Sequence, residues 1–99
     1  MNAALPAADV YYEQAACGLL ATDADGMIVR ANATIHVWLG AQSDALTGKL
    51  RFCDLLSVGA RLFHHTRCVP LLQREGAVNE VQVDLLTLDG RHLPVLLNI

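Results

Sequence analysis

Two Asp-Gly pairs, each between short apolar runs, constrain the fold of this chain most strongly. The first pair closes the segment Asp23–Gly26, which separates the apolar runs 17–22 and 27–31. The second pair, Asp89-Gly90, separates two further stretches rich in Val and Leu. Glycine readily adopts the positive φ angle that a tight hairpin turn requires. The sequence therefore predicts two β-hairpins, one in each half of the chain.

The second hairpin has the clearer apolar period. Val81, Val83 and Leu85 alternate with polar residues, which predicts a strand with one dry face and one wet face. In the last strand the apolar residues again share one face: Leu93, Val95, Leu97 and Ile99. Pro94 fits this strand near its start, or at a position that donates no ladder hydrogen bond.

Between the hairpins the apolar spacing becomes that of a helix. Asn32 is a good N-cap, and Gly40 stands where a left-handed residue ends a helix. Ile35, Trp38 and Leu39 fall on one face of the helix between them. The sequence predicts one compact helix that is delimited at both ends.

Two shorter helices are predicted on either side of this one. Residues 7–16 are good helix formers and end before Gly18. Ser43 is placed to cap a second short helix over residues 44–46, which Gly48 would end.

The longest helical stretch runs from Ser57 to Gly76. Apolar residues and one histidine recur in it at steps of three and four: Val58, Leu62, His65, Val69 and Leu72. Pro70 lies inside this stretch, has no N–H for the carbonyl of Thr66, and crowds that turn with its ring. We therefore expect a kink or break near residues 66–70. The whole pattern predicts an α+β fold, with an antiparallel sheet and a helical insert between two hairpins.

Size and charge exclude some classes of protein. A chain of 99 residues with 54% hydrophobic residues is one domain with ample material for a core, which excludes disorder. The chain carries 7 Lys and Arg residues against 10 Asp and Glu, has a net charge of -3, and contains no basic run. Nucleic acid is therefore not an expected partner, because its phosphates require clustered cations.

Three features predict where the protein resides. Residues 1–9 lack the positive region and the apolar core of a secretory signal. No stretch of the sequence approaches the roughly 20 apolar residues of a membrane span. The cysteines are odd in number and widely spaced, which fits reduced thiols better than a disulfide framework: Cys17, Cys53 and Cys68. We expect a cytoplasmic protein without direct membrane insertion, or the cytoplasmic part of a membrane-anchored sensor.

The order of these elements and a series of short motifs resemble the PAS family. In the first half the matching residues are Gly18-Leu19, Asp23 to Gly26, Met27 to Val29, Asn32 and Leu39-Gly40. In the second half they are Leu46 to Gly48, Phe52 to Leu56, Gly76, Glu80, Asp89-Gly90 and Pro94 to Leu96. The ordered set extends over residues 12–99.

The resemblance implies a bacterial sensory domain with an antiparallel sheet of five strands. In the family the last strand lies between the first and the penultimate one, whereas this sequence supplies only four strands. We therefore expect a flanking helix at residues 1–16 and a PAS domain without its final strand at residues 17–99. Because unpaired strand edges associate readily, we expect the gap to be filled by a partner chain or by direct pairing of strands one and four.

The sequence contains no common catalytic signature, since it lacks a phosphate-binding loop, a nucleophile elbow and an HExxH motif. Four aspartates are conceivable acid–base pairs, but three of them lie in or beside the predicted turns, where Asp is common for structural reasons: Asp23, Asp25, Asp84 and Asp89. We therefore predict no catalytic residues and no enzymatic activity in this domain. The resemblance allows a kinase, cyclase or phosphatase output domain in the parent protein.

The long helix carries the candidate ligands for a metal or a haem iron. His64 and Cys68 are four residues apart, and His65 adds a second imidazole. The corresponding helical element holds the iron ligand in haem-binding PAS sensors, so His65, on the predicted apolar face, is the candidate for haem. A second His or Cys pair at ligand spacing is missing, which favours ordinary histidines and no metal site. A flavin photoadduct is not expected, because Leu50 stands where the light-sensing members have their reactive cysteine.

Two surfaces are candidates for function. We expect a ligand pocket between the sheet and the helices, unless the same side chains simply fill the core, and its lining is predicted as Trp38, Phe52, Leu56, Leu62, Phe63, His65, Val69, Val83 and Leu97. On the N-terminal helix, Val10, Tyr11 and Tyr12 offer apolar area for a homodimer contact or for packing against their own domain.

Two hypotheses about function result. In the first, the domain is a sensory module in which a small apolar ligand or a partner shifts a conformational equilibrium, and the shift is passed to an output domain of the same parent protein. In the alternative, it is a ligand-free dimerisation and interaction module. Visible absorbance or added mass in the purified protein would favour the first hypothesis. Concentration-dependent dimers that polar substitution of Tyr11 and Tyr12 abolishes would favour the second.

Overall fold

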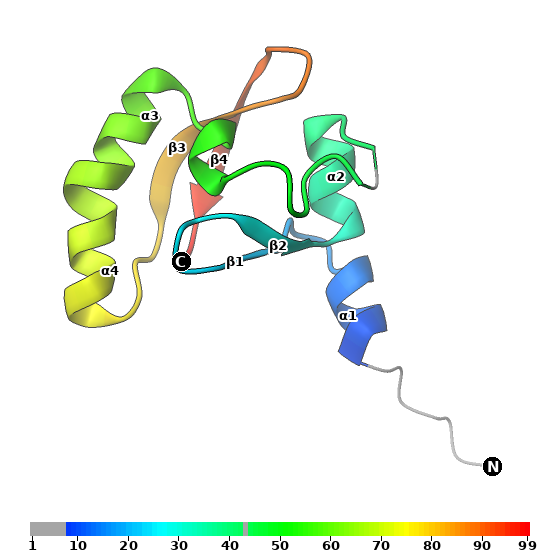
Figure 1. Cartoon of the computed structure of the whole chain (residues 1–99), viewed down its shortest axis with the longest axis horizontal. Coiled ribbons are helices and arrows are strands. Elements are labelled where there is room, and N and C mark those ends of the chain that lie inside the picture. The colour runs from blue at the N-terminus through cyan, green and yellow to red at the C-terminus, as the bar shows by residue number, and fades with distance from the viewer. Residues whose placement is uncertain (1–7, 43) are drawn as a thin grey trace. The chain divides into compact units, whose positions relative to one another are not determined.

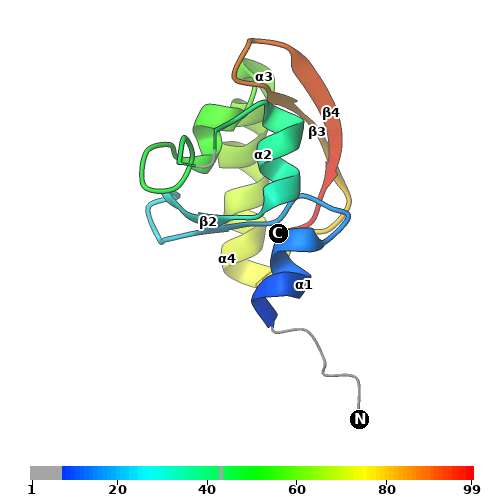
Figure 2. The ribbon, with the colours of Figure 1, turned by 90° about the vertical axis from the view of Figure 1, so that its right-hand side faces the viewer.

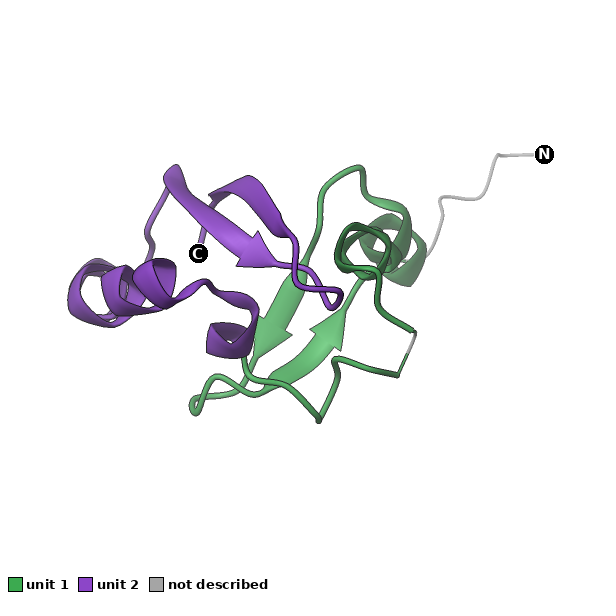
Figure 3. Ribbon diagram, turned by 90° about the horizontal axis from the view of Figure 1, so that it is seen from above, with its two compact units in different colours: residues 1–51 green, residues 52–99 purple. Residues whose placement is uncertain are grey.

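The computed structural model of the chain describes residues 8–42 and 44–99. The chain divides into two compact units, residues 1–51 and 52–99, and each unit contains its own antiparallel sheet of two strands (Figures 1 and 3). The predicted α+β class with small antiparallel sheets is confirmed. The single sheet implied by the PAS resemblance, and the way its last strand would be supplied, stay predictions. Across the described ranges, no helix combines the length and apolar character needed to cross a membrane.

The first hairpin pairs β1 (Leu20–Thr22) with β2 (Ile28–Ala31). Asp23 organises the turn, because its Oδ1 accepts hydrogen bonds from the backbone N–H groups of Asp25 and Met27, at 2.9 and 3.0 Å. An aspartate carboxylate that bonds its own following main chain is a common way to build a turn. The predicted first hairpin is confirmed.

Helices α1 (Ala8–Gln14) and α2 (Ala33–Leu39) complete the regular structure of the first unit. Helix α2 starts as predicted, because the side chain of Asn32 accepts the N–H of Ile35 at 3.1 Å. It also ends as predicted, at Gly40 with a left-handed φ of 67°.

The side chain of Asn32 joins three segments of this unit. It is fully buried, and its Oδ1 accepts a second hydrogen bond from the N–H of Leu19 at 3.0 Å. Its Nδ2 donates to the carbonyl oxygens of Tyr12 and Cys17, each at 2.9 Å. All four hydrogen-bonding positions of the amide are therefore used. They hold the end of α1 and the start of β1 against the first turn of α2.

Residues 44–46 do not form the predicted second short helix. They lie in a series of turns, and Ser43, the expected cap, lies outside the described residues. The N–H of Gly48 instead donates to the carbonyl of Ile28 at 2.7 Å, and the N–H of Ile28 donates to the carbonyl of Leu50 at 3.0 Å. The segment thereby pairs with the second edge of β2. Within the segment itself, the N–H of Ala45 bonds to the carbonyl of Gln42 at 3.0 Å and closes a turn.

The second unit contains a helical rod that is visible along its length in Figure 1. A short 3₁₀ helix η1 (Phe52–Leu55) precedes it, and the rod consists of α3 (Val58–Phe63), a π-helical turn η2 (His64–Cys68) and α4 (Val69–Glu75). In the π-helical turn the N–H of Val69 bonds to the carbonyl of His64, five residues back. The predicted break near Pro70 is confirmed as a π-helical turn. The wider turn relieves the steric crowding before Pro70, which has no N–H.

The apolar face predicted for this rod is wrong for three of its five residues, whereas Val69 and Leu72 are half-buried. Val58 and Leu62 are 84% and 65% exposed, and His65 is exposed as well. Less exposed residues recur at steps of four instead: Ala60 and His64 are half-buried, and Cys68 is only 2% exposed. Val58 and Leu62 precede the π-helical turn, so the additional residue of that turn does not account for their exposure. The spacing of apolar residues did not reveal which side of α3 is covered.

The second hairpin pairs β3 (Val81–Leu86) with β4 (His92–Leu97), which lie side by side in Figure 2. Burial alternates along both strands as predicted, and the less exposed face carries Val81, Val83, Leu85, Leu93, Val95 and Leu97. The intervening turn is held by the hydroxyl of Thr87, which donates to Asp89 and accepts the N–H of Arg91 at 2.9 Å. The hydrogen bond from Thr87, followed by the nearby Arg91, lowers the pKa of Asp89.

An irregular segment around Glu80 precedes β3. Val78 and Ile99 exchange two backbone hydrogen bonds of 3.0 and 2.7 Å. Between this pair and the ladder, Glu80 has a left-handed φ of 58°, and its N–H donates to Oδ1 of Asn98 at 2.8 Å. A left-handed backbone costs a non-glycine residue roughly 1 kcal/mol or more, so the bond to Asn98 helps to hold a strained residue.

Candidate functional site in the second unit

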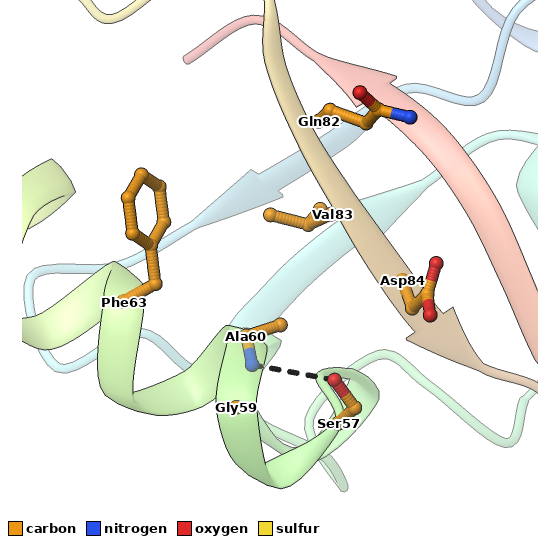
Figure 4. A pocket seen from close by; sticks show the side chains of 7 residues that line it. All are labelled: Ser57, Gly59, Ala60, Phe63, Gln82, Val83 and Asp84. Atoms are coloured by element: carbon orange, nitrogen blue, oxygen red, sulfur yellow. Dashed lines mark hydrogen bonds between the residues drawn. The ribbon is translucent and has the colours of Figure 1, made fainter.

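A hollow with a volume of about 320 Å³ lies between α3 and β3 (Figure 4). Residues of the helix form one wall and consecutive residues of the strand form the other: Ser57, Gly59, Ala60 and Phe63, and then Gln82, Val83 and Asp84. Ligand pockets in proteins typically occupy roughly 300–1,000 Å³. The hollow is therefore large enough for a few side-chain groups, and it is the candidate functional site.

Ser57 fixes the helical wall to the strand. Its Oγ accepts the N–H of Ala60 at 3.3 Å and caps α3, as the dashed line in Figure 4 shows. Its own N–H donates to the carbonyl oxygen of Asp84 at 3.4 Å. The preceding residue, Leu56, pairs with Leu85 as an isolated antiparallel bridge. The start of α3 is therefore held against the C-terminal half of β3.

The strand wall of the hollow is the edge of β3 that faces away from β4. Successive residues of a strand turn their main-chain groups to opposite sides. The N–H of Thr87 donates to the carbonyl of Arg91 at 2.8 Å, so every second residue before Thr87, including Val83, turns toward β4. Gln82 and Asp84 turn outward, as the bond from Ser57 to Asp84 confirms.

Much of this outer edge has no main-chain partner. Ser57 and Leu56 cover it only from Asp84 onward. Among residues 8–42 and 44–99, no backbone group bonds to the outward N–H and carbonyl of Gln82 or to the N–H of Asp84. These groups border the hollow and remain available for hydrogen bonds.

The two faces of β3 beside this edge differ in polarity. Figure 4 shows Val83 directed toward α3, while the amide of Gln82 and the carboxylate of Asp84 are directed away from it. Phe63, which is 42% exposed, stands on the helical wall. Oδ2 of Asp84 lies 3.4 Å from Nδ1 of His92, and both of these side chains are about half exposed. Such exposed pairs contribute little energy, so the carboxylate remains accessible to another cation.

Phe63 and Val83 are the predicted pocket residues that the structure brings together in this hollow. Leu56 is buried, but as the bridge partner of Leu85. The ring of Phe52 packs edge-on against the ring of His64, with centroids 5.3 Å apart.

The remaining predicted pocket residues lie outside the hollow. Leu62 and His65 are exposed on the helical rod, and Val69 and Leu97 are half-buried. Trp38 belongs to the first unit and is 41% exposed. The larger pocket that would collect all of these side chains stays a prediction.

His64 is the imidazole that the π-helical turn directs inward, in place of the predicted His65. Its Nδ1 is buried and has no hydrogen-bond partner among the described residues. Burial, and then the neighbouring His65, lower the pKa of His64. The neutral form of His64 is therefore favoured in the folded unit.

Cys68 lies four residues after His64 and is only 2% exposed. Burial raises the pKa of the Cys68 thiol, which disfavours the thiolate that binds metals. Within residues 8–42 and 44–99, no group of three or more His, Cys, Asp and Glu side chains is placed to hold a metal ion. The ring of His65, the proposed haem ligand, lies edge-on to the ring of His64, with centroids 5.8 Å apart.

The three residues predicted for a dimer contact have different surroundings. Tyr12 contacts its own unit, because its hydroxyl donates to the carbonyl of Leu19 at 3.1 Å and the guanidinium of Arg30 lies 4.0 Å from its ring centroid. Burial raises the pKa of Tyr12, and Arg30 partly opposes this. Val10 and Tyr11 are exposed, Tyr11 by 59%, and they are the residues left for a contact with a second chain. That contact stays a prediction.

The sequence reasoning missed most of the hollow: Ser57, Gly59, Ala60, Gln82 and Asp84. Ser57 was identified as a helix start and the two polar residues as the wet face of a strand. Ala60, a small residue in the first turn after the cap, was the available signal for a close approach of helix and strand. Alternation along a strand does not reveal which of its edges lacks a partner.

The comparisons with known proteins give one relative. No family model matches the chain. The chain is 32% identical over 90 residues to the phosphoserine phosphatase RsbP of Bacillus subtilis (strain 168). The match covers 91% of this chain and 22% of RsbP, so the chain spans about a fifth of the length of that relative. The similarity extends over both units of this chain and concerns one part of RsbP.

Proposed function

We propose that this chain is the sensory or regulatory PAS module of a larger bacterial signalling protein and has no catalytic activity of its own. The observation that carries the proposal is the unequal coverage of the match to RsbP, 91% of this chain against 22% of the phosphatase. Such coverage is expected when two proteins share one module and differ in the rest. The order of hairpin, helices and hairpin agrees with the family that the sequence motifs resemble.

In this proposal the module acts on an output domain of the same parent protein. RsbP is a phosphoserine phosphatase, so an output of that class is the first candidate. A ligand or partner shifts the output only by as much as its affinity differs between two conformations of the module, with about 1.4 kcal/mol for each tenfold difference.

A chimera tests the proposal. The matched segment of RsbP is replaced by this 99-residue chain, and phosphoserine phosphatase activity is compared among RsbP, RsbP without the segment and the chimera. We expect the deletion to change the rate and the chimera to restore it toward that of RsbP. A chimera with Asn32→Ala should resemble the deletion, because this substitution removes the bonds that organise the first unit.

Two results would contradict the proposal. A chimera that behaves like the deletion, while circular dichroism shows that the inserted chain is folded, would mean that the segment is not an exchangeable regulatory module. Hydrolysis of a phosphoserine peptide by the isolated chain would mean that the chain is itself catalytic.

The exposure of Val10 and Tyr11 favours a second candidate function, a ligand-free dimerisation module. In that case Tyr11→Asp should convert dimers to monomers in analytical ultracentrifugation. Glu13→Gln, on the same helix, is the matched control and should leave the dimers intact. A wild-type chain that is monomeric at all concentrations would exclude this candidate.

A further inference from the structure

We propose that the open edge of β3 beside α3 binds an extended peptide segment of a partner protein. The segment would add to β3 as a further strand, with apolar and basic side chains in alternation. This inference goes beyond the regulatory role proposed above and does not depend on it, because it rests on the geometry of the second unit alone.

The main chain of β3 supplies the first part of the argument. Gln82 presents an outward N–H and carbonyl, and Asp84 presents an outward N–H, without backbone partners in the described part of the chain. Unpaired strand edges bind extended peptides because each added residue pair satisfies main-chain groups on both sides.

The open stretch has defined ends. At its C-terminal end the carbonyl of Asp84 is occupied by the N–H of Ser57. At its N-terminal end Glu80 leaves the extended conformation, with a φ of 58°. Strands rise about 3.3 Å per residue, so the edge accommodates a short segment of a few residues. The binding mode therefore suits a short linear motif rather than a folded surface.

The hollow supplies an apolar subsite for this segment. Residues of an added strand alternate between the two faces of the sheet, and one face is that of Val83. Ala60 and Phe63 of α3 stand opposite Val83, and the volume of about 320 Å³ between the walls is open for a side chain. A Val or Leu side chain on this face of the peptide would bury apolar surface against Phe63, which is now 42% exposed.

The other face of β3 selects for positive charge. The side chains of Gln82 and Asp84 are directed away from α3 in Figure 4 and would lie beside the alternate residues of an added strand. Opposite charges on neighbouring strands attract, whereas like charges repel. Among the described residues, the carboxylate of Asp84 has only the half-exposed His92 within ion-pair distance, at 3.4 Å. A Lys or Arg residue in the peptide would therefore be favoured and a Glu residue disfavoured.

A designed peptide tests the inference with the full 99-residue chain. The probe is a fluorescein-labelled, N-acetylated and C-amidated hexapeptide of alternating Lys and Val, measured by fluorescence anisotropy and by amide chemical shifts. Two matched control peptides carry N-methyl groups on alternate residues, one on the Lys residues and the other on the Val residues. An added strand turns only every second N–H toward β3, so one control should bind more than tenfold more weakly than the probe and the other nearly as well. The largest shifts should fall on Gln82 to Asp84.

Variants of the protein complete the test. Gln82→Pro removes an outward N–H and should reduce affinity at least tenfold, whereas Gln82→Ala, which keeps the main chain, should not. Asp84→Asn should weaken binding of the Lys peptide about twofold to fivefold, and Glu75→Gln is the control for a carboxylate elsewhere. A Glu and Val peptide should bind more weakly than the Lys and Val peptide.

The inference is overturned if the probe does not bind at millimolar concentration, or if the two N-methylated peptides bind alike. It is also overturned if the chemical shifts lie away from β3 and α3. Should Gln82→Pro unfold the chain, the difference between the two N-methylated peptides still decides the question.

Discussion

Replacement of Asn32 should be the most destabilising single polar substitution in the first unit. Asn32→Ala removes hydrogen bonds to the N–H groups of Leu19 and Ile35, and to the carbonyls of Tyr12 and Cys17. Each such bond contributes about 1 kcal/mol net, so the four together amount to about 4 kcal/mol. Domains of this size are stable by roughly 5–15 kcal/mol, so the variant should lose at least about a quarter of the free energy of unfolding.

A graded series separates the contributions. Asn32→Ser keeps an oxygen that can cap the N–H of Ile35 and should lose about 3 kcal/mol. The control is Asn98→Ala, which removes one exposed hydrogen bond to the N–H of Glu80, at 2.8 Å, and should cost about 1 kcal/mol. The measurement is urea denaturation followed by the fluorescence of Trp38, the single tryptophan, and by circular dichroism.

The order of the three variants is the critical result. If Asn32→Ala costs no more than Asn98→Ala, the buried amide does not hold α1, β1 and α2 together, and the assignment of Asn32 as their common partner is wrong. Equal costs for Asn32→Ala and Asn32→Ser would limit the error to the capping bond.

Three further predictions concern single positions. Gly18→Ala should destabilise the chain by about 1–3 kcal/mol in urea denaturation, because a new Cβ would lie 2.7 Å from Cδ1 of the buried Ile35. Gly59→Ala should stabilise α3 by up to about 1 kcal/mol, because its new Cβ would meet nothing within 4 Å. The reverse order of the two variants would refute both predictions. Glu80→Gly should stabilise by up to about 1 kcal/mol and Glu80→Val should destabilise, because only glycine tolerates φ 58° without strain; a neutral Val variant would show that the residue is not strained. Because the pKa of His64 is lowered on folding, the unfolded chain binds more protons, so the free energy of unfolding should fall as pH is lowered from about 7 through the ordinary histidine range. His64→Gln should flatten this dependence, and His65→Gln should flatten it less, because the neighbouring imidazole is only the second cause of the lowered pKa of His64; an unchanged slope in His64→Gln would contradict the assignment.

The hairpins and caps could be predicted from the sequence because their signals are local. Asp23 bonds the backbone two and four residues ahead, and Asn32 caps the helix that it precedes. The alternation of β3 and β4 likewise reflects neighbouring residues on two faces. In each case the residues that carry the signal also make the contact.

The failed predictions involve residues that are far apart in the sequence. The turn segment at residues 44–46 has helix-forming residues, but the bonds of Gly48 and Leu50 to Ile28 connect positions about twenty residues apart and determine its conformation. No local propensity contains that information. The three other hydrogen bonds of the Asn32 side chain were likewise not foreseeable, because Leu19, Tyr12 and Cys17 approach it through the fold.

The helical rod shows why an apolar period alone did not place the hollow. Pro70 was correctly expected to disturb the helix, and the disturbance takes the form of a π-helical turn at His64–Cys68. Val58 and Leu62 precede that turn and are nevertheless exposed, so the spacing of apolar residues along α3 did not reveal which side of the helix is covered. Ala60, a small residue, lines the hollow beside β3 instead. The position of the hollow therefore follows from the side of α3 that packs against β3, and this packing joins residues more than twenty positions apart in the sequence.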